Sequence, residues 1–463
     1  MRSARRHPLL VATAAALPLA LAAADAHAQA RDRARASAVV DSLARSPVAA
    51  RQVAGLAVAV VRGRDTLLAR AYGSADLEND VPATVGHVFQ IASITKQFTA
   101  AAVLKLVEAG QVALDDDVTR YLPDAPTQGR RVTVRQLLSH TSGMPDVAEL
   151  PAFQGVKRRD LAPDSLIALV RGEPFYFPPG EQMRYSNTGY LLLGRLVEKV
   201  SGRPYAEYVA EALFRPAGMT TSRDCDQRAL IPRRVTGYDH TPAGFQRAEF
   251  ISLRIPFAAG ALCSTALDLV AWSRALHGGR ILGPAAYAEM TRAPAITGGR
   301  RTRYGLGLAT GAFAGRRAYH HGGDIQGFTS YLVHFPDDSL TVAVLMNTQG
   351  PARPDALAER LAEAVLGARP AVAGAATPGG LSRFVGEYGD DVKVTATERG
   401  LRLERGPMPP VELHPAGGTT FTDGRSSYTF EPRDGAATAL WADLIWAVVR
   451  WDRKGEERRA SAP

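Results

Sequence analysis

The 463-residue sequence has little cysteine, because only Cys225 and Cys263 are present. Two cysteines can pair in an oxidising compartment, but they cannot form the framework of a chain this long, which excludes a disulfide-stapled scaffold. Whether the two residues meet is left open by the sequence. The chain is long enough to bury more than one hydrophobic core.

Several motifs of metal-binding and hydrolytic proteins are also absent. The sequence has neither His-Glu-x-x-His, which binds zinc in many proteases, nor Gly-x-Ser-x-Gly, which carries the nucleophile of α/β-hydrolases. The run Asp115-Asp116-Asp117 lacks the spaced ligands and closing glutamate of a calcium loop, so we expect a solvated turn there. The sequence predicts no metal site and no cofactor.

The sequence also lacks a long run of charges of one sign. The formal net charge is +9, yet the basic residues are dispersed, with only short clusters such as Lys157-Arg158-Arg159 and Arg300-Arg301. Binding to nucleic acid usually needs a concentrated basic patch. We therefore expect no nucleic-acid partner.

The first residues have the pattern of a secretory signal. Arg2, Arg5 and Arg6 precede an apolar run from Leu9 to Ala24, and Ala26-His27-Ala28 fits an A-x-A cleavage site. The run is too short and too rich in alanine for a transmembrane anchor, and no cysteine follows for lipid attachment. We expect cleavage near Ala28 and a periplasmic or secreted mature protein. Its formal charge would be +7, because residues 1–28 contain three arginines and one aspartate.

Composition indicates where the chain divides. From Leu366 to Gly380 the sequence LGARPAVAGAATPGG consists mainly of small residues, glycine and proline, which is typical of a linker. Beyond it, stretches such as VKVTATERGLRLERG alternate apolar and polar residues, as half-buried strands do. We predict a signal peptide (1–28), a main domain (29–367), a linker (368–380), a small antiparallel β domain (381–457) and a tail (458–463).

The main domain has strands at its two ends and helices between them. Residues 53–73 and 327–347 are predicted β-hairpins. Helical patterns end on Gly110, Gly202 and Gly278, and a last helix is predicted over 355–367. This order favours one sheet that closes around a helical insertion, with an active site in the cleft between the two layers.

Ser93 and Lys96 stand one helical turn apart in FQIASITKQFTAAAVLKL (89–106), an otherwise apolar stretch. A serine hydroxyl is a weak nucleophile that needs a base, and burial can lower the pKa of a lysine enough to make it one. Spacing of three residues puts both groups on one face of a helix. The alternative is a lysine that extends to solvent beside a capping serine. The chain has only six lysines, so this pairing is a rare coincidence.

Tyr185 and Asn187 form the second candidate stretch, in FPPGEQMRYSNTGYLLLG, where a turn delivers them to a helix start. A phenol near Lys96 can share its proton, first as base and then as acid toward the leaving group. The Asn187 amide can orient Lys96 or a substrate. The alternative for Tyr185 is a half-buried aromatic residue with a satisfied hydroxyl.

His321-Gly322-Gly323 forms the third candidate stretch, at the start of a predicted strand that leads into a hairpin. Glycines weaken a strand, and a common reason to accept them is close approach of a ligand to the backbone. The similar run His277-Gly278-Gly279 ends a helical pattern, where such residues are ordinary caps. We therefore prefer His321, and we interpret His140 in LLSHTSG as a loop-bracing residue.

These three stretches, in this order, resemble the serine β-lactamases of class C and the related DD-peptidases, D-aminopeptidases and family VIII esterases. The likeness extends over about residues 38 to 367 and includes LLSHTSGMP, AGALCSTALDLVAW and HGGDIQGF. It implies an α+β fold in which an α/β sandwich with a mixed, mainly antiparallel sheet carries an all-helical subdomain. The C-terminal β domain similarly resembles the lipocalin-like barrel of some members.

The resemblance also implies the roles of individual residues. Ser93 would be acylated, Lys96 and Tyr185 would transfer protons, and water would release the acyl group. The backbone N–H groups of Ser93 and Asp324 would form the oxyanion hole. Asn187, together with His321, Gly322 and Gly323, would bind or orient the substrate.

The sequence departs from the family at the third stretch. Class C β-lactamases and DD-peptidases commonly have Lys-Thr-Gly there, and His321 and Gly322 replace the lysine and the threonine. A histidine is mostly neutral at pH 7, so the fixed charge that holds a substrate carboxylate is missing. We expect His321 to gain that charge between about pH 8 and 6, given its usual pKa near 6.5.

The sequence thus predicts an exported serine hydrolase that acts through an acyl-enzyme on ester or amide bonds. Its activity would be that of an esterase, a D-aminopeptidase or a D-Ala-D-Ala carboxypeptidase, with weak β-lactamase activity. Its substrates would be small molecules or peptides, with peptidoglycan fragments as one source. Two alternatives remain open: a penicillin-sensor-like module that is acylated without turnover, and a catalytically silent scaffold. No residue of the β domain is needed for the predicted chemistry, so we expect a chain ending near Ala375 to stay active.

Overall fold

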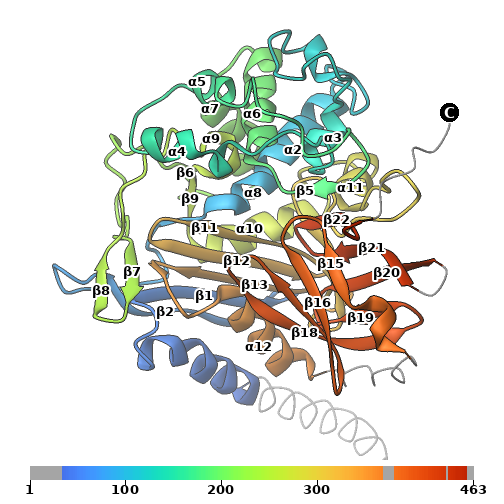
Figure 1. Ribbon diagram of the computed structural model, residues 1–463. Coiled ribbons are helices and arrows are strands. Elements are labelled where there is room, and N and C mark those ends of the chain that lie inside the picture. Colours follow the sequence, from blue (N-terminus) through green and yellow to red (C-terminus); the bar gives the residue numbers. More distant parts are fainter. Residues whose placement is uncertain (1–33, 369–379, 434–435, 456–463) are drawn as a thin grey trace, which may run out of the picture.

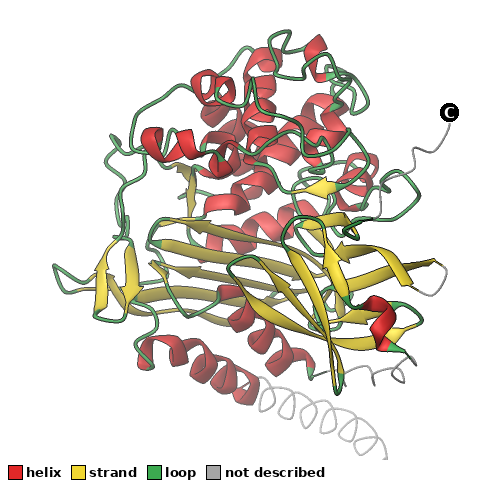
Figure 2. Ribbon diagram, viewed as in Figure 1, coloured by secondary structure: helices red, strands yellow, loops and turns green. Residues whose placement is uncertain are grey.

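The computed structural model describes residues 34–368, 380–433 and 436–455. The predicted signal peptide, the tail and most of the predicted linker lie outside these ranges. The described residues form a central sheet with helices on both faces, a helical region above it and a second sheet from the C-terminal residues (Figures 1 and 2).

The central sheet joins the two ends of the main domain. Its seven strands lie in the order β10-β11-β12-β13-β1-β2-β3, and their neighbours pair antiparallel. The two predicted hairpins are present, as β1–β2 and β12–β13, and they meet at the centre of the sheet. The strands are β1 (Gly55–Arg62), β2 (Asp65–Asp76), β3 (Val81–Pro82), β10 (Ala309–Phe313), β11 (Arg316–Ile325), β12 (Phe328–Phe335) and β13 (Leu340–Met346).

The centre of this sheet is buried on both faces, where β1 and β13 are apolar at nearly every position. Leu56, Val58 and Val60 point to one face and belong to the core that includes α12 (Pro354–Leu366) and the helix over residues 34–49. The alternate residues Ala57 and Ala59 point to the other face and belong to the core of the helical region. Strands buried on both faces need no polar alternation.

The helical region is the insertion that the sequence predicts. Two of the predicted helix ends have a left-handed glycine, Gly110 and Gly202, whereas at the third the left-handed residue is Gly279 rather than Gly278. The α-helices are α2 (Thr95–Glu108), α3 (Val134–Leu138), α4 (Pro151–Val156), α5 (Pro163–Ala168), α6 (Asn187–Ser201), α7 (Tyr205–Val209), α8 (Arg215–Ala217), α9 (Phe257–Gly260), α10 (Ala266–His277) and α11 (Pro284–Thr291). Short turns are η1 (Ala92–Ile94), η2 (Val118–Arg120), η3 (Val147–Glu149) and the π turn η4 (Ala210–Phe214).

Two small sheets connect the layers. One has the order β4-β9-β6 and the other β14-β7-β8. A disulfide between Cys225 and Cys263, with Cα atoms 5.1 Å apart, joins β6 to β9 and answers the question that the sequence leaves open. The strands are β4 (Phe89–Gln90), β6 (Arg223–Asp224), β7 (Tyr238–Thr241), β8 (Gly244–Arg247), β9 (Leu262–Ser264) and β14 (Thr348–Gln349).

The C-terminal strands do not form the expected lipocalin-like barrel. In the described part of the chain they form an open antiparallel sheet, β15 to β22 in sequence order, whose last neighbour is β5 (Met183–Arg184) of the main domain. β15 also meets the end of β22, through a bridge from Tyr388 to Arg453 with flanking backbone hydrogen bonds and an ion pair between Lys454 and Glu387 (2.8 Å). At Ala447 and Val448, however, the outer edge of β22 pairs with β5 and not with β15, so the sheet stays open. The strands are β15 (Gly386–Tyr388), β16 (Val392–Thr397), β17 (Gly400–Arg405), β18 (Met408–Gly417), β19 (Thr420–Thr422), β20 (Ser427–Arg433), β21 (Ala436–Asp443) and β22 (Ala447–Asp452), preceded by the turn η5 (Leu381–Phe384).

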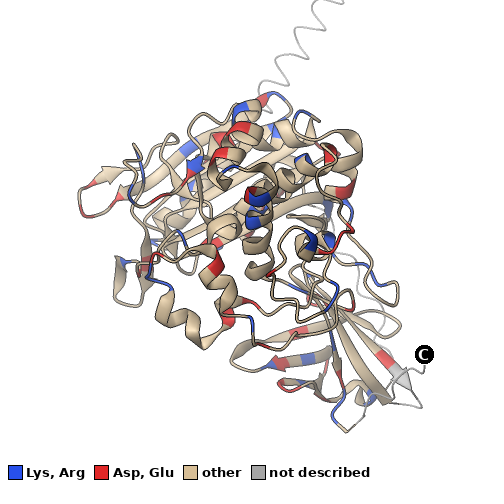
Figure 3. Ribbon diagram, turned by 90° about the horizontal axis from the view of Figure 1, so that it is seen from above, with Lys and Arg blue, Asp and Glu red and all other residues tan. Residues whose placement is uncertain are grey.

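Charged residues are interspersed over the ribbon, as the sequence indicates. Seen from above, basic and acidic positions are scattered among one another over the ribbon (Figure 3). Many of them pair locally, such as Arg195 with Asp164 at 2.7 Å and Arg120 with Asp116 at 2.9 Å. Among the described residues, no helix is long and apolar enough to cross a membrane.

Candidate active site

Ser93 lies in the turn η1, directly before helix α2. Its neighbour Ala92 has a positive φ of 45°, a conformation that costs free energy in a residue other than glycine. Contacts on both sides hold the turn, because the backbone N–H of Ile91 donates to Leu262 (3.0 Å) and the Ser330 hydroxyl donates to the Ile91 carbonyl (2.9 Å). The half-buried Ser93 is therefore presented on a strained strand-to-helix turn.

Lys96 is fully buried one turn later, so it does not extend to solvent. Its Nζ lies 3.2 Å from Ser93 Oγ, 2.9 Å from Asn187 Oδ1 and 2.7 Å from the Ala259 carbonyl. Burial lowers the pKa of Lys96 to about 7, although the charge of Asp146 acts in the opposite direction. An amine with this pKa is partly neutral at physiological pH, and a neutral amine can accept the proton of Ser93.

Asp146 is a site residue that the sequence analysis missed. It is 4% exposed, and its Oδ2 accepts a 2.9 Å hydrogen bond from Nδ2 of Asn187. Burial raises the pKa of Asp146, and the backbone N–H of Ala148 acts against this effect. The only signal in the sequence is that Asp146 directly follows the stretch LLSHTSGMP.

Tyr185 follows strand β5 and precedes helix α6. Nζ of Lys96 lies 4.7 Å from the centre of its ring. Burial raises the pKa of the Tyr185 hydroxyl, and Ser93 lies near enough to act against this effect. The hydroxyl oxygen is buried and makes no hydrogen bond within the described residues, so its hydrogen-bonding capacity is unused near Ser93.

His140 braces this tyrosine, as the sequence analysis predicts. Its ring lies 4.3 Å from the Tyr185 ring, measured between centroids. Its Nδ1 accepts a 3.1 Å hydrogen bond from the backbone N–H of Ser186. Burial lowers the pKa of His140 well below its ordinary value, with further contributions from Lys96 and His321. The neutral ring therefore holds the Tyr185-Ser186-Asn187 stretch in place.

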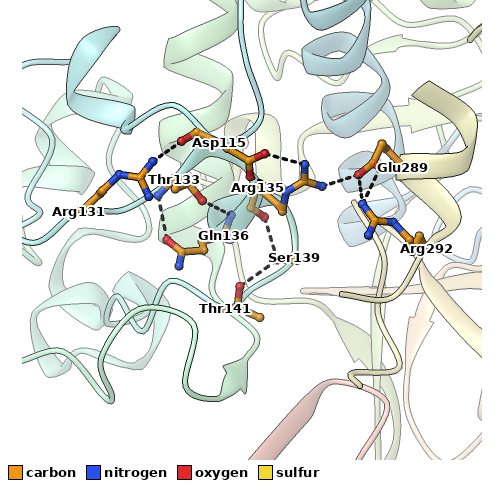
Figure 4. A network of polar contacts seen from close by, with 9 residues as sticks. All are labelled: Asp115, Arg131, Thr133, Arg135, Gln136, Ser139, Thr141, Glu289 and Arg292. Atoms are coloured by element: carbon orange, nitrogen blue, oxygen red, sulfur yellow. Dashed lines mark hydrogen bonds and ion pairs between the residues drawn. The ribbon is translucent and has the colours of Figure 1, made fainter. Parts of the chain in front are cut away.

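A polar network surrounds α3, the helix that ends shortly before His140 (Figure 4). Thr133 and Gln136 form a reciprocal cap at the start of α3. Arg135 joins Asp115 (2.7 Å) to Glu289 of α11. In the acidic run 115–117, Asp116 accepts a 2.5 Å hydrogen bond from the Tyr121 hydroxyl, and the Asp117 side chain caps the turn η2. Each of the three aspartates therefore has a structural partner.

His321 lies on β11 with both ring nitrogens occupied. Nδ1 lies 2.6 Å from the Gly322 carbonyl, so this nitrogen donates, and Nε2 accepts from the Tyr304 hydroxyl at 2.9 Å. Burial lowers the pKa of His321 to about 3, with Lys96 as the next cause. The expectation that His321 becomes charged between pH 8 and 6 is wrong, because a ring only 1% exposed beside a lysine strongly disfavours a second charge.

The two glycines after His321 bring the strand close to the nucleophile turn. A Cβ atom on Gly323 would lie 2.2 Å from the Ile91 carbonyl oxygen and 2.3 Å from Ser330 Oγ, whereas one on Gly322 would approach Tyr331 to only 3.3 Å. The close approach is therefore made by the protein's own backbone, at Gly323. His277, in contrast, is the last residue of α10, and its Nδ1 lies 2.8 Å from the Tyr287 hydroxyl on α11.

A pocket of about 220 Å³ opens beside Ser93. Both residues of the expected oxyanion hole, Ser93 and Asp324, line it together with Asn187. Most of the other lining residues are apolar, among them Val147, Phe153, Leu191, Ile251 and Ile255, while Gln326 and Gln349 are polar. Two larger hollows, of about 490 and 450 Å³, lie beside Arg195 and hold none of the candidate catalytic residues.

The Beta-lactamase family model matches residues 40–367. Among curated proteins, the chain is 28% identical to penicillin-binding protein 4* of Bacillus subtilis over 79% of this chain and 86% of that one. It is 31% identical to a D-aminopeptidase of Cereibacter sphaeroides over 66% of this chain, and this match spans 59% of the D-aminopeptidase's length.

Solved structures of related proteins are also similar to this chain. The D-amino acid amidase of Ochrobactrum anthropi SV3, complexed with L-phenylalanine amide, has 29% sequence identity and a TM-score of 0.64 over 71% of this chain and 98% of that one. The octameric penicillin-binding protein homologue of Pyrococcus abyssi has 26% identity and a TM-score of 0.63 over 89% of this chain and 98% of that one. With its α+β architecture and this match over most of its length, the chain belongs to the Beta-lactamase family and is a serine hydrolase of the penicillin-recognising superfamily.

Proposed function

We propose that this protein hydrolyses amide bonds, and esters of the same acids, through an acyl-enzyme formed on Ser93. Lys96 is the base, Tyr185 transfers protons and Asn187 orients Lys96. The backbone N–H groups of Ser93 and Asp324 stabilise the oxyanion. The observation that carries the proposal is the 3.2 Å approach of Lys96 Nζ to Ser93 Oγ in a site where burial lowers the lysine's pKa to about 7.

The proposed reaction has two steps. Neutral Lys96 accepts the Ser93 proton as Oγ attacks the substrate carbonyl. The C–N or C–O bond then breaks, and the leaving amine or alcohol receives a proton through Tyr185, which Lys96 can replenish. Water next attacks the acyl-enzyme, the bond from the acyl carbon to Oγ breaks, and Ser93 regains its proton while the carboxylic acid departs.

The proposed substrates are amides of D-amino acids with an apolar side chain. The apolar lining beside Ser93 suits such a side chain, since burial of apolar surface favours binding. Similarity to a D-aminopeptidase and to a D-amino acid amidase points in the same direction. Neutral His321 leaves the third stretch without the family's fixed positive charge, so we expect only weak activity toward β-lactams.

We also propose that the protein is exported. The pattern over residues 1–28 carries this proposal, and those residues lie outside the described part of the chain. Expression of the full gene product in a bacterial host tests it. Mass measurement of periplasmic and cytoplasmic fractions should find a chain that begins near Gln29, and an uncleaved chain confined to the cytoplasm would contradict export.

A substrate panel tests the proposed reaction. The purified protein is assayed with D- and L-phenylalanine amide, a D-phenylalanine ester, a D-Ala-D-Ala peptide and a chromogenic cephalosporin, beside Ser93→Ala as control. We expect D-phenylalanine amide to be hydrolysed fastest among the amides and peptides, and Ser93→Ala to be inactive. Stoichiometric acylation without turnover would favour the penicillin-sensor-like module, and no acylation of a folded protein would favour the silent scaffold.

A further inference from the structure

The C-terminal sheet reaches the candidate active site through the turn between β21 and β22. The backbone N–H of Tyr185 donates to the carbonyl of Trp446 at 3.2 Å. From there β22 pairs with β5, with Ala447 opposite Arg184 and Val448 opposite Met183. The strand that delivers Tyr185 is therefore an edge of the C-terminal sheet, which lies against the main domain in Figure 1.

The contact between β22 and the main domain is buried and includes an ion pair. Val448 is fully buried in one apolar cluster with Met183, Ile296, Tyr304 and Ala309. Beside the cluster, Arg300 forms a 2.7 Å ion pair with Asp443, and both side chains are largely buried. The turn that carries Trp446 therefore has a fixed position.

The Trp446 ring packs on residues of the site. Its centroid lies 4.9 Å from that of His321, 5.8 Å from that of Tyr185 and 6.0 Å from that of Tyr304. The apolar pocket beside Ser93 is lined by other residues, from the helical region and the strand end at Asp324. Trp446 thus borders the site at Tyr185 and His321 and is not among the residues that line that pocket.

We propose that Trp446 is a specificity-determining residue that forms the wall of the leaving-group side. The proposal rests on the function proposed above: if Tyr185 delivers a proton to the leaving group, that group leaves beside Tyr185. The acyl part then occupies the apolar pocket, and a rigid indole limits what fits on the opposite side. The protein accepts small leaving groups, such as ammonia or methanol, better than bulky ones.

Two esters with the same acyl group test this inference. D-phenylalanine methyl and butyl esters form the same acyl-enzyme, so the ratio of their kcat/KM values reports acylation and is free of deacylation. We expect Trp446→Ala to raise the butyl-to-methyl ratio at least about fivefold and Trp446→Phe to raise it less, as expected for removal of a steric wall. The matched control is Trp451→Ala on β22, the strand that follows Trp446. The Trp451 ring contacts Gly389 and Arg405 instead, and this variant should leave the ratio unchanged.

The outcomes separate the two proposals. If both Trp446 variants still hydrolyse the esters but their butyl-to-methyl ratio of kcat/KM is unchanged or lower, Trp446 is not a wall of the leaving-group side. The proposed function is unaffected by that result. If Trp446→Ala does not fold, the same judgement rests on Trp446→Phe and Trp446→Leu. A wild-type protein that neither hydrolyses the esters nor is acylated at Ser93 overturns the proposed function and this inference with it.

Discussion

Nδ2 of Asn187 donates a 2.9 Å hydrogen bond to Oδ2 of Asp146. This bond fixes the amide so that its oxygen faces Lys96, whose Nζ lies 2.9 Å from Oδ1. The charge of Asp146 also raises the pKa of Lys96 against the larger effect of burial. Asp146 therefore acts on the candidate base through both orientation and charge.

Two substitutions of Asp146 separate these effects. Asp146→Asn removes the charge that favours protonated Lys96, so the lysine's pKa falls and the rising limb of the kcat/KM profile moves to lower pH. Asp146→Ala also leaves the Asn187 N–H without its acceptor, and we expect a further loss of roughly tenfold, as for an unpaired buried polar group. Profiles measured from pH 5 to 9 check both, and a limb that moves to higher pH in Asp146→Asn would contradict the account.

Lys96 sets the pH dependence of the wild-type protein. A general base must be neutral, and the pKa of Lys96 is lowered to about 7, so kcat/KM for a neutral ester should rise with pH and reach half its plateau near pH 7. Lys96→Arg keeps a charge that cannot be lost and should abolish this limb together with most of the activity. A profile that stays flat from pH 5 to 8 would remove Lys96 from the role of base.

Gly323 and Gly322 provide a matched pair for the nucleophile turn. Alanine at Gly323 would place Cβ 2.2 Å from the Ile91 carbonyl oxygen, whereas at Gly322 the nearest atom is a Tyr331 ring carbon at 3.3 Å. We expect Gly323→Ala to destabilise the protein by about 1–3 kcal/mol and to reduce kcat more than Gly322→Ala does. Thermal unfolding and steady-state kinetics measure this difference, and equal effects of the two variants would show that close packing at Gly323 is unimportant.

Removal of the C-terminal sheet should inactivate the protein, contrary to the expectation from the sequence. A chain ending at Ala375 would lack Val448 and Asp443, which would expose Met183 and leave Arg300 without its partner. It would also lose the hydrogen bond from Tyr185 to Trp446. We expect a lower Tm and a loss of kcat/KM well beyond tenfold, because about 1.4 kcal/mol at the site is already tenfold. A folded truncated chain with wild-type kinetics would refute this coupling.

Local pattern was enough to predict part of this structure. The spacing of Ser93 and Lys96 places both on one helical face whatever surrounds them, and glycines mark the ends of α2 and α6. The hairpins β1–β2 and β12–β13 are set by short turns between apolar strands. In each case the signal and its consequence lie within a few residues of one another.

Contacts distant in sequence explain what was missed. Nothing around Trp446 indicates that it approaches Tyr185, and Asp146 has only its position after LLSHTSGMP as a signal, since each reaches the site through the pairing or packing of another element. The prediction of a lipocalin-like barrel was wrong because β22 pairs at Ala447 and Val448 with β5, a strand of two residues that has no pattern of its own in the sequence. The pH dependence of His321 was wrong because the burial of a histidine depends on its neighbours in space.

Mass mapping of a fluorophosphonate adduct tests the central claim most directly. We predict that the probe labels the full-length protein once, at Ser93, that Ser93→Ala is not labelled, and that Lys96→Ala is labelled at least about 100-fold more slowly, the lower end of general-base contributions. Circular dichroism of each variant serves as the control for folding. Labelling at another residue, or no labelling of correctly folded wild-type protein, would contradict the claim that Ser93 and Lys96 form the catalytic pair.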